Sequence, residues 1–598
     1  MRGSAIWAGL IVAGLAGPAA AQEFTFDVPG ASADLDTAVK GASLVRQAVR
    51  GDTTPGAADL FASAREDYAR ILGTLYDQGY FSGTISIRLN GREAATIQPI
   101  DAPETIRSID IQVIPGPRSV FSHAGIGPVA PKTTLPVEYR QGETARTGVI
   151  LNAATTGVSG WRDEGHAKAK VGDQRITVDH RRNTVSSDIY LAPGPVTYFG
   201  ELHAKGNQRL RTERLMEIAG YPTGEKFTPK RMEEVRNRLR RTGIFSSVTL
   251  TEAETLRNGN LLDAQLQVAE DKRRRLGFGV EYGTSDGVSL SGYWLHRNLL
   301  GGGERLRFDA EITGIGGTTG GTDYALGVRL DRPATFTPDT SGFVVAKAAR
   351  DHEEDYVQRS FTLGAGLSHI FNERLTGEIA LQYQWAKVTY DRGDEIYRYV
   401  SLPGTLTWDN RDIPSDATRG YYGKLGLTPF YGLDDNTGSG LQLTADARAY
   451  KGFGENNSYV LAGRLQVGGV FGPGLSKTPR DYLFYSGGGG TVRGQPYQSL
   501  GVYELYDGTL KTGGTRFIGV SGEFRASVTQ SIGVVAFYDA GYVSAQDYLN
   551  DSGEWQSGAG LGLRYKTPIG PIRLDIAGPV SGGTGDGAQL YLGIGQAF

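Results

Sequence analysis

Apolar and polar residues alternate along most of the second half of the chain. In one run a single charged residue separates Leu306 from Phe308, and in another Ile379, Leu381 and Tyr383 occupy every second position. A period of two with one apolar face is typical of a strand that is buried on one side. The pattern continues from about residue 275 to residue 598, so it predicts a sheet built from more than half of the chain.

We count about sixteen strands in this region. Their expected cores are residues 276–284, 288–297, 304–313, 323–331, 342–350, 358–370, 375–390, 398–409, 419–429, 440–451, 458–471, 514–527, 532–544, 557–566, 571–578 and 588–598. A soluble sandwich would give the same alternation. The length, the aromatic content and an N-terminal export signal instead favour a transmembrane β-barrel with an apolar outside and a polar inside. The barrel must close, because unpaired backbone groups in lipid are costly.

The first and last strands would meet at a lateral seam. The last run, residues 588–598, has an apolar face that ends in a phenylalanine, and two glycines on the opposite face weaken it. If the seam opens, the first strand offers unpaired N–H and C=O groups with which an incoming hairpin could pair. The residues that we expect at this seam are Phe278, Val280, Leu592, Gly593, Gly595 and Phe598.

The first half of the chain has a different texture and contains a repeat. A Pro-Gly-Pro segment followed by an aromatic residue begins at Pro115 and returns at Pro193. A helix-like stretch that ends in glycine and leads into an extended run occurs three times, at Gly79, Gly165 and Gly243. Helices are expected over residues 67–76 and 228–239, where apolar residues recur at helical spacing. These features predict three small α+β units of about 80 residues each.

The N-terminus carries a targeting signal. A basic start, an apolar run over residues 5–15 and small residues before Gln22 match a secretory signal peptide, with cleavage expected after Ala21. The apolar run is too short for a spanning helix, which needs about 20 residues. The predicted division is therefore a signal peptide at 1–21, α+β units at 22–116, 117–194 and 195–272, and a barrel at 273–598.

Composition narrows the possible functions. Glycine accounts for 86 of 598 residues without a strict period of three, which excludes collagen. The net charge of −3 gives no support to nucleic-acid binding, and the absence of cysteine excludes a disulfide framework and a cysteine nucleophile. Ser285 stands in a G-x-S-x-G match, but it joins two expected strands and not a strand and a helix. We expect no catalytic residue, no metal and no cofactor.

A long glycine-rich segment precedes the strand at 514–527 and contains Arg493. Alternation places Phe537, Asp539 and Gly541 on one face of the next strand, and Glu523 lies in the strand between. If these faces point into the barrel, the arginine can fold inward and meet a carboxylate, because a guanidinium–carboxylate fork is directional and is strengthened away from bulk water. The alternative is a solvated loop arginine and a turn aspartate.

Three segments resemble motifs of one family. Residues 298–306, Asn-Leu-Leu-Gly-Gly-Gly-Glu-Arg-Leu, resemble the second hairpin of Omp85 barrels. Val492, Arg493 and Gly494 resemble the tip of the long sixth extracellular loop, although Gln495 stands where the family has an aromatic residue. Residues 537–541 resemble the late-strand F-x-D-x-G motif. The order of these motifs after three repeats resembles the Omp85 superfamily, with periplasmic POTRA domains and a sixteen-stranded outer-membrane barrel.

The resemblance has implications for partners and function. Three repeats are similar to the TamA-like branch, since BamA-type assembly factors usually carry five and two-partner secretion pores usually carry two. That branch implies assembly of unfolded outer-membrane and autotransporter proteins, contact with outer-membrane lipid and a TamB-like partner anchored in the inner membrane. It also implies that Arg493 latches the loop to Glu523 and Asp539. A dedicated secretion pore and a passive outer-membrane channel remain as alternatives.

Overall fold

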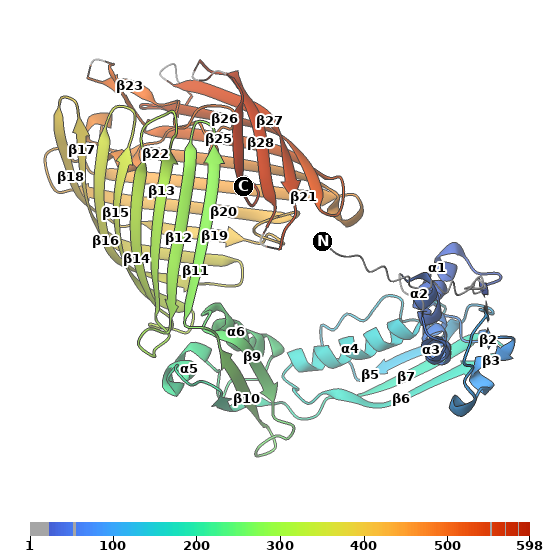
Figure 1. Cartoon of the computed structure of the whole chain (residues 1–598). Helices are drawn as coiled ribbons and strands as arrows, with labels where there is room; N and C mark the ends of the chain where they lie inside the picture. The colour runs from blue at the N-terminus through green and yellow to red at the C-terminus, as the bar shows by residue number, and fades with distance from the viewer. Residues whose placement is uncertain are drawn as a thin grey trace, which may run out of the picture. The chain divides into compact units, whose positions relative to one another are not determined.

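The computed structural model describes residues 23–51, 55–506, 508–549, 553–568, 570–583, 585 and 587–598 (Figure 1). The expected signal peptide lies outside the described residues. The chain divides into two compact units. One comprises Met1–Glu201, Pro222–Arg231 and Ala253–Asp263, and the other comprises Leu202–Tyr221, Met232–Glu252 and Ala264–Phe598. None of the described helices is both long enough and apolar enough to cross a membrane.

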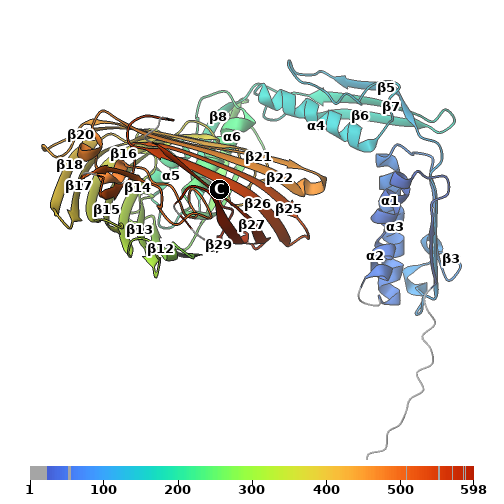
Figure 2. The same cartoon turned by 90° about the horizontal axis from the view of Figure 1, so that it is seen from above.

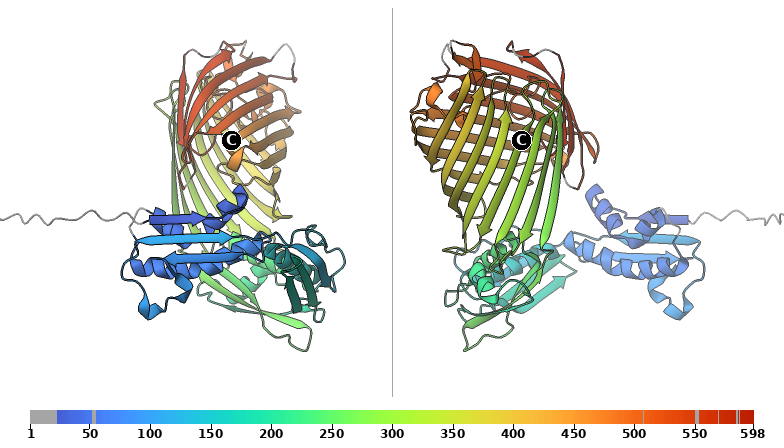
Figure 3. Two further views of the ribbon diagram at one scale, coloured as in Figure 1. Left: turned by 90° about the vertical axis from the view of Figure 1, so that its right-hand side faces the viewer. Right: turned by 60° about the vertical axis from the view of Figure 1, so that its left-hand side comes forward.

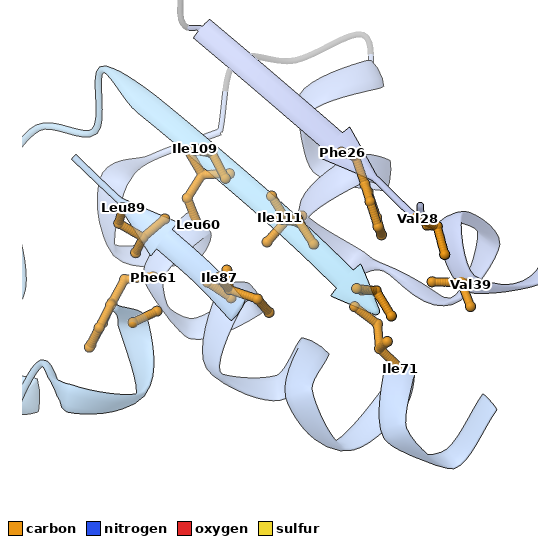
Figure 4. Packing of buried hydrophobic residues seen from close by; sticks show 14 of the residues in the cluster. Phe26, Val28, Val39, Leu60, Phe61, Ile71, Ile87, Leu89, Ile109 and Ile111 are labelled. Atoms are coloured by element: carbon orange, nitrogen blue, oxygen red, sulfur yellow. The ribbon is translucent and has the colours of Figure 1, made fainter. Parts of the chain in front are cut away.

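The first α+β region packs helices against a four-stranded sheet. Its elements are β1 (Glu23–Asp27), α1 (Ala33–Ala42), α2 (Leu44–Arg50), α3 (Ala57–Asp77), β2 (Thr84–Leu89), β3 (Arg92–Glu93), the short helices η1 (Ala94–Thr96) and η2 (Pro99–Asp101), and β4 (Ser108–Ile114). The sheet order is β1-β4-β2-β3. Ile71 on α3, Ile87 on β2 and Ile111 on β4 belong to one buried apolar core, which is drawn in Figure 4. The helix expected over residues 67–76 is the C-terminal half of α3.

The second and third α+β regions are each built on three strands. The second comprises β5 (Val120–Gly127), α4 (Thr147–Asp163), β6 (Lys170–Asp179) and β7 (Thr184–Ala192), with α4 along one face of the sheet β5-β7-β6 (Figure 2). The third comprises β8 (Tyr198–Lys205), α5 (Thr212–Ala219), α6 (Pro229–Arg241), β9 (Phe245–Glu252) and β10 (Leu261–Glu270), in the sheet order β8-β10-β9. Helix α6 starts within one residue of the expected position.

Strands from β11 to β29 form one closed antiparallel barrel, coloured from green to red in Figures 1 and 3. Its strands are β11 (Arg274–Gly283), β12 (Gly287–Arg297), β13 (Arg305–Ile315), β14 (Asp323–Arg332), β15 (Thr340–His352), β16 (Val357–Ile370), β17 (Leu375–Tyr390), β18 (Gly393–Ser401), β19 (Gly404–Asp409), β20 (Gly420–Gly432), β21 (Gly440–Phe453), β22 (Tyr459–Phe471), β25 (Arg516–Ser527), β26 (Ile532–Ser544), β27 (Glu554–Tyr565), β28 (Ile572–Ser581) and β29 (Gln589–Ile594). The predicted fold class is confirmed.

One predicted strand is divided. The run expected at 398–409 consists of β18 and β19, which both pair with β17 and β20 and therefore share one place in the wall. Pro403 lies between them and has no N–H to donate to the ladder, which is why the strand is interrupted there. Counting β18 and β19 as one strand gives sixteen positions around the barrel.

Alternation separates the two faces of the barrel wall. Leu326, Leu363 and Leu381 are 63%, 49% and 63% exposed on the outer face, as side chains that face lipid would be. Charged residues pair on the inner face, for example Arg329 with Glu378 and Arg448 with Asp446. An apolar outside and a polar inside are therefore both present in the wall.

The segment between β22 and β25, residues 472–515, is called loop 6 below. It contains the short helices η4 (Leu475–Lys477) and η5 (Arg480–Tyr482) and the hairpin β23 (Val502–Leu505) with β24 (Leu510–Thr512). A further short helix, η3 (Glu455–Asn457), joins β21 to β22. Val492, Arg493 and Gln495 of loop 6 are all buried. Loop 6 is therefore packed against the barrel wall at its tip.

Helices of the third α+β region contact the turn between β14 and β15. Arg238 and Arg241 on α6 form ion pairs with Asp339 at 2.7 and 2.5 Å. Arg214 on α5 donates to the carbonyl oxygen of Pro333 at 2.6 Å and to that of Gly302 at 3.1 Å. These contacts attach α5 and α6 to the end of the barrel that carries the β12–β13 and β14–β15 turns.

Candidate functional site

Arg493 lies at the tip of loop 6 and is 2% exposed. Its Nε donates to Oδ2 of Asp539 at 2.7 Å and its Nη2 donates to Oδ1 at 3.1 Å, which is a two-pronged fork. The backbone N–H of Arg493 donates to the same carboxylate at 3.2 Å. The contact considered from the sequence between Arg493 and Asp539 is thus present, and it fixes both the side chain and the backbone of the loop tip.

Two further carboxylates complete the surroundings of Arg493. Its Nη1 lies 2.7 Å from Oε1 of Glu523 and 3.2 Å from Oδ2 of Asp575. The three acidic side chains come from β25, β26 and β28. These three carboxylates compensate the buried guanidinium, a group that is not deprotonated in proteins. The arginine therefore stays charged.

Small and aromatic residues shape the space around this ion cluster. The Cζ atom of Arg493 lies 3.5 Å from the centre of the Phe537 ring, in the geometry of a cation–π contact. Gly541 makes room for the loop, since a Cβ there would come within 2.1 Å of Oγ of Ser486. Gly494 has a φ of +93°, and a Cβ there would come within 2.5 Å of the Gly578 carbonyl oxygen. Both glycines permit the close approach of loop and wall.

Gln495 uses its amide group where an aromatic residue was expected. It is fully buried, and its Nε2 donates to the carbonyl oxygens of Ser557 and Ser581 at 2.9 Å each. Those residues lie in β27 and at the end of β28. The loop tip is therefore tied to two neighbouring strands by an amide, while Val492 is buried beside it.

Sequence reasoning missed Asp575 and Arg564. Arg564 on β27 binds both oxygens of Asp575, and its side chain is 3% exposed. Arg525 on β25 donates from Nε to Oε2 of Glu523 at 2.8 Å. Three arginines thus face three carboxylates in the lumen. Alternation in β27 and β28 could have identified both residues as luminal, because Leu563 and Ile576 face outward beside them.

The first and last strands meet over a short length. In the described part of the chain, the register between β11 and β29 consists of Tyr282 opposite Leu592 and Gly283 opposite Tyr591. Thr284 adds a hydrogen bond from its N–H to the carbonyl oxygen of Leu590 at 3.0 Å. In contrast, β11 is paired with β12 at ten positions from Arg274 to Gly283. The barrel is closed, but among the described residues this seam is the junction of the wall with the fewest paired positions.

The predicted seam residues fall into two groups. Phe278, Val280 and Leu592 face outward and are 83%, 57% and 44% exposed, and Gly593 lies within β29 opposite Arg573. Gly595 and Phe598 do not lie in the seam, because β29 ends at Ile594. Gly595 has a φ of +97° and donates its N–H to the carbonyl oxygen of Pro571 at 2.7 Å, so the chain turns out of the strand there.

Phe598 is consequently directed inward and not onto the outer face. It is 8% exposed and packs with Ala417, Tyr450 and Ala462. Its carbonyl oxygen accepts a hydrogen bond from Nη2 of Arg525 at 3.1 Å. The expected strand at 588–598 is therefore corrected to Gln589–Ile594, followed by an inward-turned segment of residues 595–598.

The candidate nucleophile occupies a hairpin turn. Ser285 lies between β11 and β12, and its Oγ donates to Oδ1 of Asp286 at 2.7 Å. A nucleophile elbow requires a strand followed by a helix, so this geometry does not support one. Across the described residues, no group of three or more His, Cys, Asp or Glu is arranged to hold a metal ion.

Comparison with known families gives two matches. A family model described as "Omp85 superfamily domain" matches residues 298–598, which is half of the chain. A POTRA model described as "Surface antigen variable number repeat" matches residues 197–271, the third α+β region. The first match lies within the barrel, and the second covers the α+β region that directly precedes it.

Individual proteins give the same picture. The chain is 24% identical over 463 residues to "Outer membrane protein assembly factor BamA" of Nitratidesulfovibrio vulgaris, covering 73% of this chain and 56% of that protein. The chain thus spans little more than half the length of this relative. Its fold is similar to crystallised BamA of Haemophilus ducreyi lacking POTRA domains 1–3, with a TM-score of 0.60 and 18% identity over 79% of this chain and 99% of the other.

A second solved structure has a similar fold. CdiB from Acinetobacter baumannii superposes with a TM-score of 0.52 and 11% identity, covering 80% of this chain and 89% of that one. The likeness to both structures concerns the fold, while the family model that matches half of the chain decides membership. The protein belongs to the Omp85 superfamily, with its barrel in the outer membrane and its POTRA region in the periplasm.

Proposed function

We propose that this protein assembles other outer-membrane proteins, inserting or secreting β-barrel and autotransporter clients through the seam between β11 and β29. The observation that carries the proposal is the short closure of the barrel, which rests on Tyr282, Gly283 and Thr284 of the first strand and its turn. Few backbone hydrogen bonds need to break for this junction to open. Opening would expose the edge of β11 as a template.

A client strand could then be added to β11 by β-augmentation. Unpaired N–H and C=O groups are costly in lipid, so a client strand that pairs with them stabilises the opened barrel. The outward side chains Leu276, Phe278 and Val280 would lie beside the client's own lipid-facing residues. The process needs no covalent chemistry, which fits an assembly factor and not an enzyme.

Loop 6 has a separate role in this proposal. Val492, Arg493 and Gly494 latch the loop to Glu523, Phe537, Asp539 and Gly541 and keep the lumen occupied. A loop held inside the barrel by buried ion pairs narrows the path for passive diffusion, which disfavours a simple channel. The latch would instead keep the wall from β25 to β28 rigid while the seam moves.

The α+β units are assigned as three POTRA domains at 22–116, 117–194 and 195–272. Three such domains favour a TamA-like assembly factor, with a TamB-like partner anchored in the inner membrane. The barrel would contact outer-membrane lipid and unfolded outer-membrane or autotransporter proteins. A cross-link from the first POTRA unit to an inner-membrane protein would support the partner, whereas the lack of any such cross-link in cells that assemble clients would contradict it.

Photo-crosslinking in living cells tests the proposed function. A photoreactive amino acid is placed at Phe278 or Val280 on β11 and at Leu592 on β29, and captured proteins are identified by mass spectrometry. Leu326 on β14, which is also outward-facing and 63% exposed, serves as the matched control. We expect several nascent outer-membrane proteins at the seam positions and none at Leu326.

Other results would contradict the proposal. Capture of one secreted protein alone would favour a dedicated secretion pore. Crosslinks only between β11 and β29 of the same chain, during active client synthesis, would mean that the seam stays closed. Equal capture at Leu326 would mean that the contacts are nonspecific.

A further inference from the structure

The loop latch and the end of the last strand share their binding partners. Glu523 binds Arg493 through Oε1 at 2.7 Å and Arg525 through Oε2 at 2.8 Å. Arg525 in turn donates from Nη2 to the carbonyl oxygen of Phe598 at 3.1 Å, and its Cζ lies 5.6 Å from the Phe598 ring centre. One carboxylate and one arginine therefore connect the loop tip with the segment that follows β29.

A second connection runs in parallel. Asp575 binds Arg493 at 3.2 Å and also holds Arg564 through both of its oxygens. Nε of Arg564 donates to Oε1 of Gln596 at 2.8 Å. Nε2 of Gln596 then donates to Oδ1 of Asp416, in the turn before β20, at 2.9 Å. This path also ends on residues 595–598.

The three arginines and the two carboxylates that join them are buried, whereas Asp416 at the end of the second path is half-buried. The side chains of Glu523 and Asp575 are 0% exposed, and those of Arg493, Arg525 and Arg564 are 3%, 7% and 3% exposed. In such surroundings a charge that loses its partner is costly, so the arginines and carboxylates must rearrange together. If Arg493 leaves, Glu523 and Asp575 each lose one cation. Arg525 and Arg564 would then turn more fully toward these carboxylates and away from Phe598 and Gln596.

We propose that Arg525 and Arg564 couple the state of the loop latch to the state of the seam. Arg525 and Arg564 are positioning residues in this arrangement. While Arg493 is docked, the two arginines can hold residues 595–598 inward. The inward segment then anchors the end of β29 beside the seam. Release of the latch loosens that anchor. By linkage, displacement of residues 595–598 also weakens the hold on Arg493.

The inference rests on the proposed seam, but its test does not depend on client assembly. The chain contains no cysteine, so introduced thiols are its only ones. Val492→Cys reports on the latch, and Ala597→Cys reports on the inward-turned segment. Labelling rates with a polar maleimide are measured on the full-length protein in nanodiscs, and retarded migration in unheated detergent gels checks that the barrel is folded.

The decisive measurement is a double-mutant cycle. We expect Arg493→Met to raise the labelling rate of both reporters about tenfold. In an Arg525→Met/Arg564→Met background, Arg493→Met should no longer change the rate at Ala597→Cys by more than about twofold, because interacting residues are not additive. Arg493→Lys, which keeps the charge but not the fork, provides a milder variant if the methionine variant does not fold.

A matched control is available in another luminal ion pair. Arg329 on β14 binds Glu378 on β17 at 2.9 Å and Asp331 at 2.8 Å, and Arg329→Met should leave both reporters at the rate of the parent protein. The proposal is overturned if Arg493→Met exposes Val492→Cys while Ala597→Cys keeps its parent rate. Additive effects in the cycle would overturn it as well. Either result leaves client capture at the seam unaffected, so the two proposals can fail separately.

Discussion

Arg480 donates from Nε to the hydroxyl oxygen of Tyr390 at 2.8 Å and thereby joins the base of loop 6 to β17. The same guanidinium donates to the Leu475 carbonyl oxygen at 3.0 Å and to Glu395 on β18 at 3.4 Å. Tyr506, from the far end of loop 6, donates to the other oxygen of Glu395 at 2.6 Å. Loop 6 is thus held at its base by strands β17 and β18 and at its tip by β25, β26 and β28.

These two attachments predict separate effects. Thr478 is a buried position at the base of the loop, and Arg480→Met should raise the maleimide labelling rate of Thr478→Cys about tenfold. Val492→Cys at the tip should stay protected, because local openings occur in separate units. Lys477→Met, which removes an exposed charge from the same segment, is the control. Simultaneous exposure of both reporters by Arg480→Met would show that the loop is released as one body.

Breaking the contact between Arg493 and Asp539 should greatly lower the stability of the barrel. Asp539→Asn removes the carboxylate that accepts three hydrogen bonds from Arg493, and breaking a buried ion pair typically costs about 3–5 kcal/mol. We expect a lower urea midpoint for barrel unfolding in detergent, read from gel migration. Asp309→Asn breaks a half-exposed luminal pair with Arg307 and should cost at most about 1 kcal/mol. Equal losses for the two variants would contradict a special role of the latch.

Much of this arrangement could be predicted from alternation alone. Lipid on one side and a polar lumen on the other impose a period of two, so alternation groups Phe537 with Asp539 on one strand face and makes that face and Glu523 candidates for the lumen. Asp575 follows the same rule, but nothing local indicates that β28 supplies a third carboxylate to Arg493. That contact depends on how the strands are staggered around the barrel, which single strands do not encode.

The inward turn after β29 could not be predicted for a different reason. An alternating run that ends in phenylalanine predicts one continued strand. The turn depends on the positive φ of Gly595 and on partners far away in the sequence, Arg525 and Asp416. The interruption at Pro403 had a local signal, since proline cannot donate to a ladder, and it could have been anticipated.

Acid should weaken the contact between α6 and the β14–β15 turn. Burial alone would raise the pKa of Asp339, but hydrogen bonds from Arg238 and Arg241 outweigh it and hold the pKa below its ordinary value. A lowered pKa means that the contact is complete above the ordinary carboxyl pKa of about 4 and is lost as the pH falls through the lower, folded-state value. We expect the distance between spin labels at Arg240→Cys and Phe336→Cys to be constant from about pH 5 to 8 and to broaden below about pH 4.

Asp339→Asn provides the control for that titration. It removes the titrating group, so its label distances should already be broad at neutral pH and should not change on acidification. An unchanged sharp distance in Asp339→Asn would mean that the hydrogen bonds from the Arg214 side chain to the Gly302 and Pro333 carbonyl oxygens suffice to hold α5 and α6.

In the first α+β region, Asp67 is fully buried in α3 and caps the neighbouring helix α2. Its carboxylate accepts from Ser43 Oγ at 2.6 Å and from the N–H groups of Leu44 and Val45 at 2.7 and 3.2 Å. Asp67→Ala should lower the free energy of local opening of α2 by about 2 kcal/mol, the upper range for a lost cap. Hydrogen exchange of α2 amides in the full-length protein measures this. Glu66→Ala, at the exposed neighbouring position, should change it by at most about 0.5 kcal/mol.

The seam allows a last prediction, in which opening is blocked reversibly. Tyr282 and Leu592 lie directly opposite each other across the β11–β29 junction. Cysteines introduced at these two paired positions can therefore be tested for disulfide formation. If clients enter through this junction, oxidation of the double variant should stop their assembly and a reductant should restore it, whereas each single variant should remain active. A double variant at Phe361 and Trp385, which are paired between β16 and β17, tests whether any cross-wall disulfide has this effect. Assembly that continues with the β11–β29 disulfide fully formed would mean that clients do not pass through the seam, since no strand can be inserted between two covalently joined neighbours.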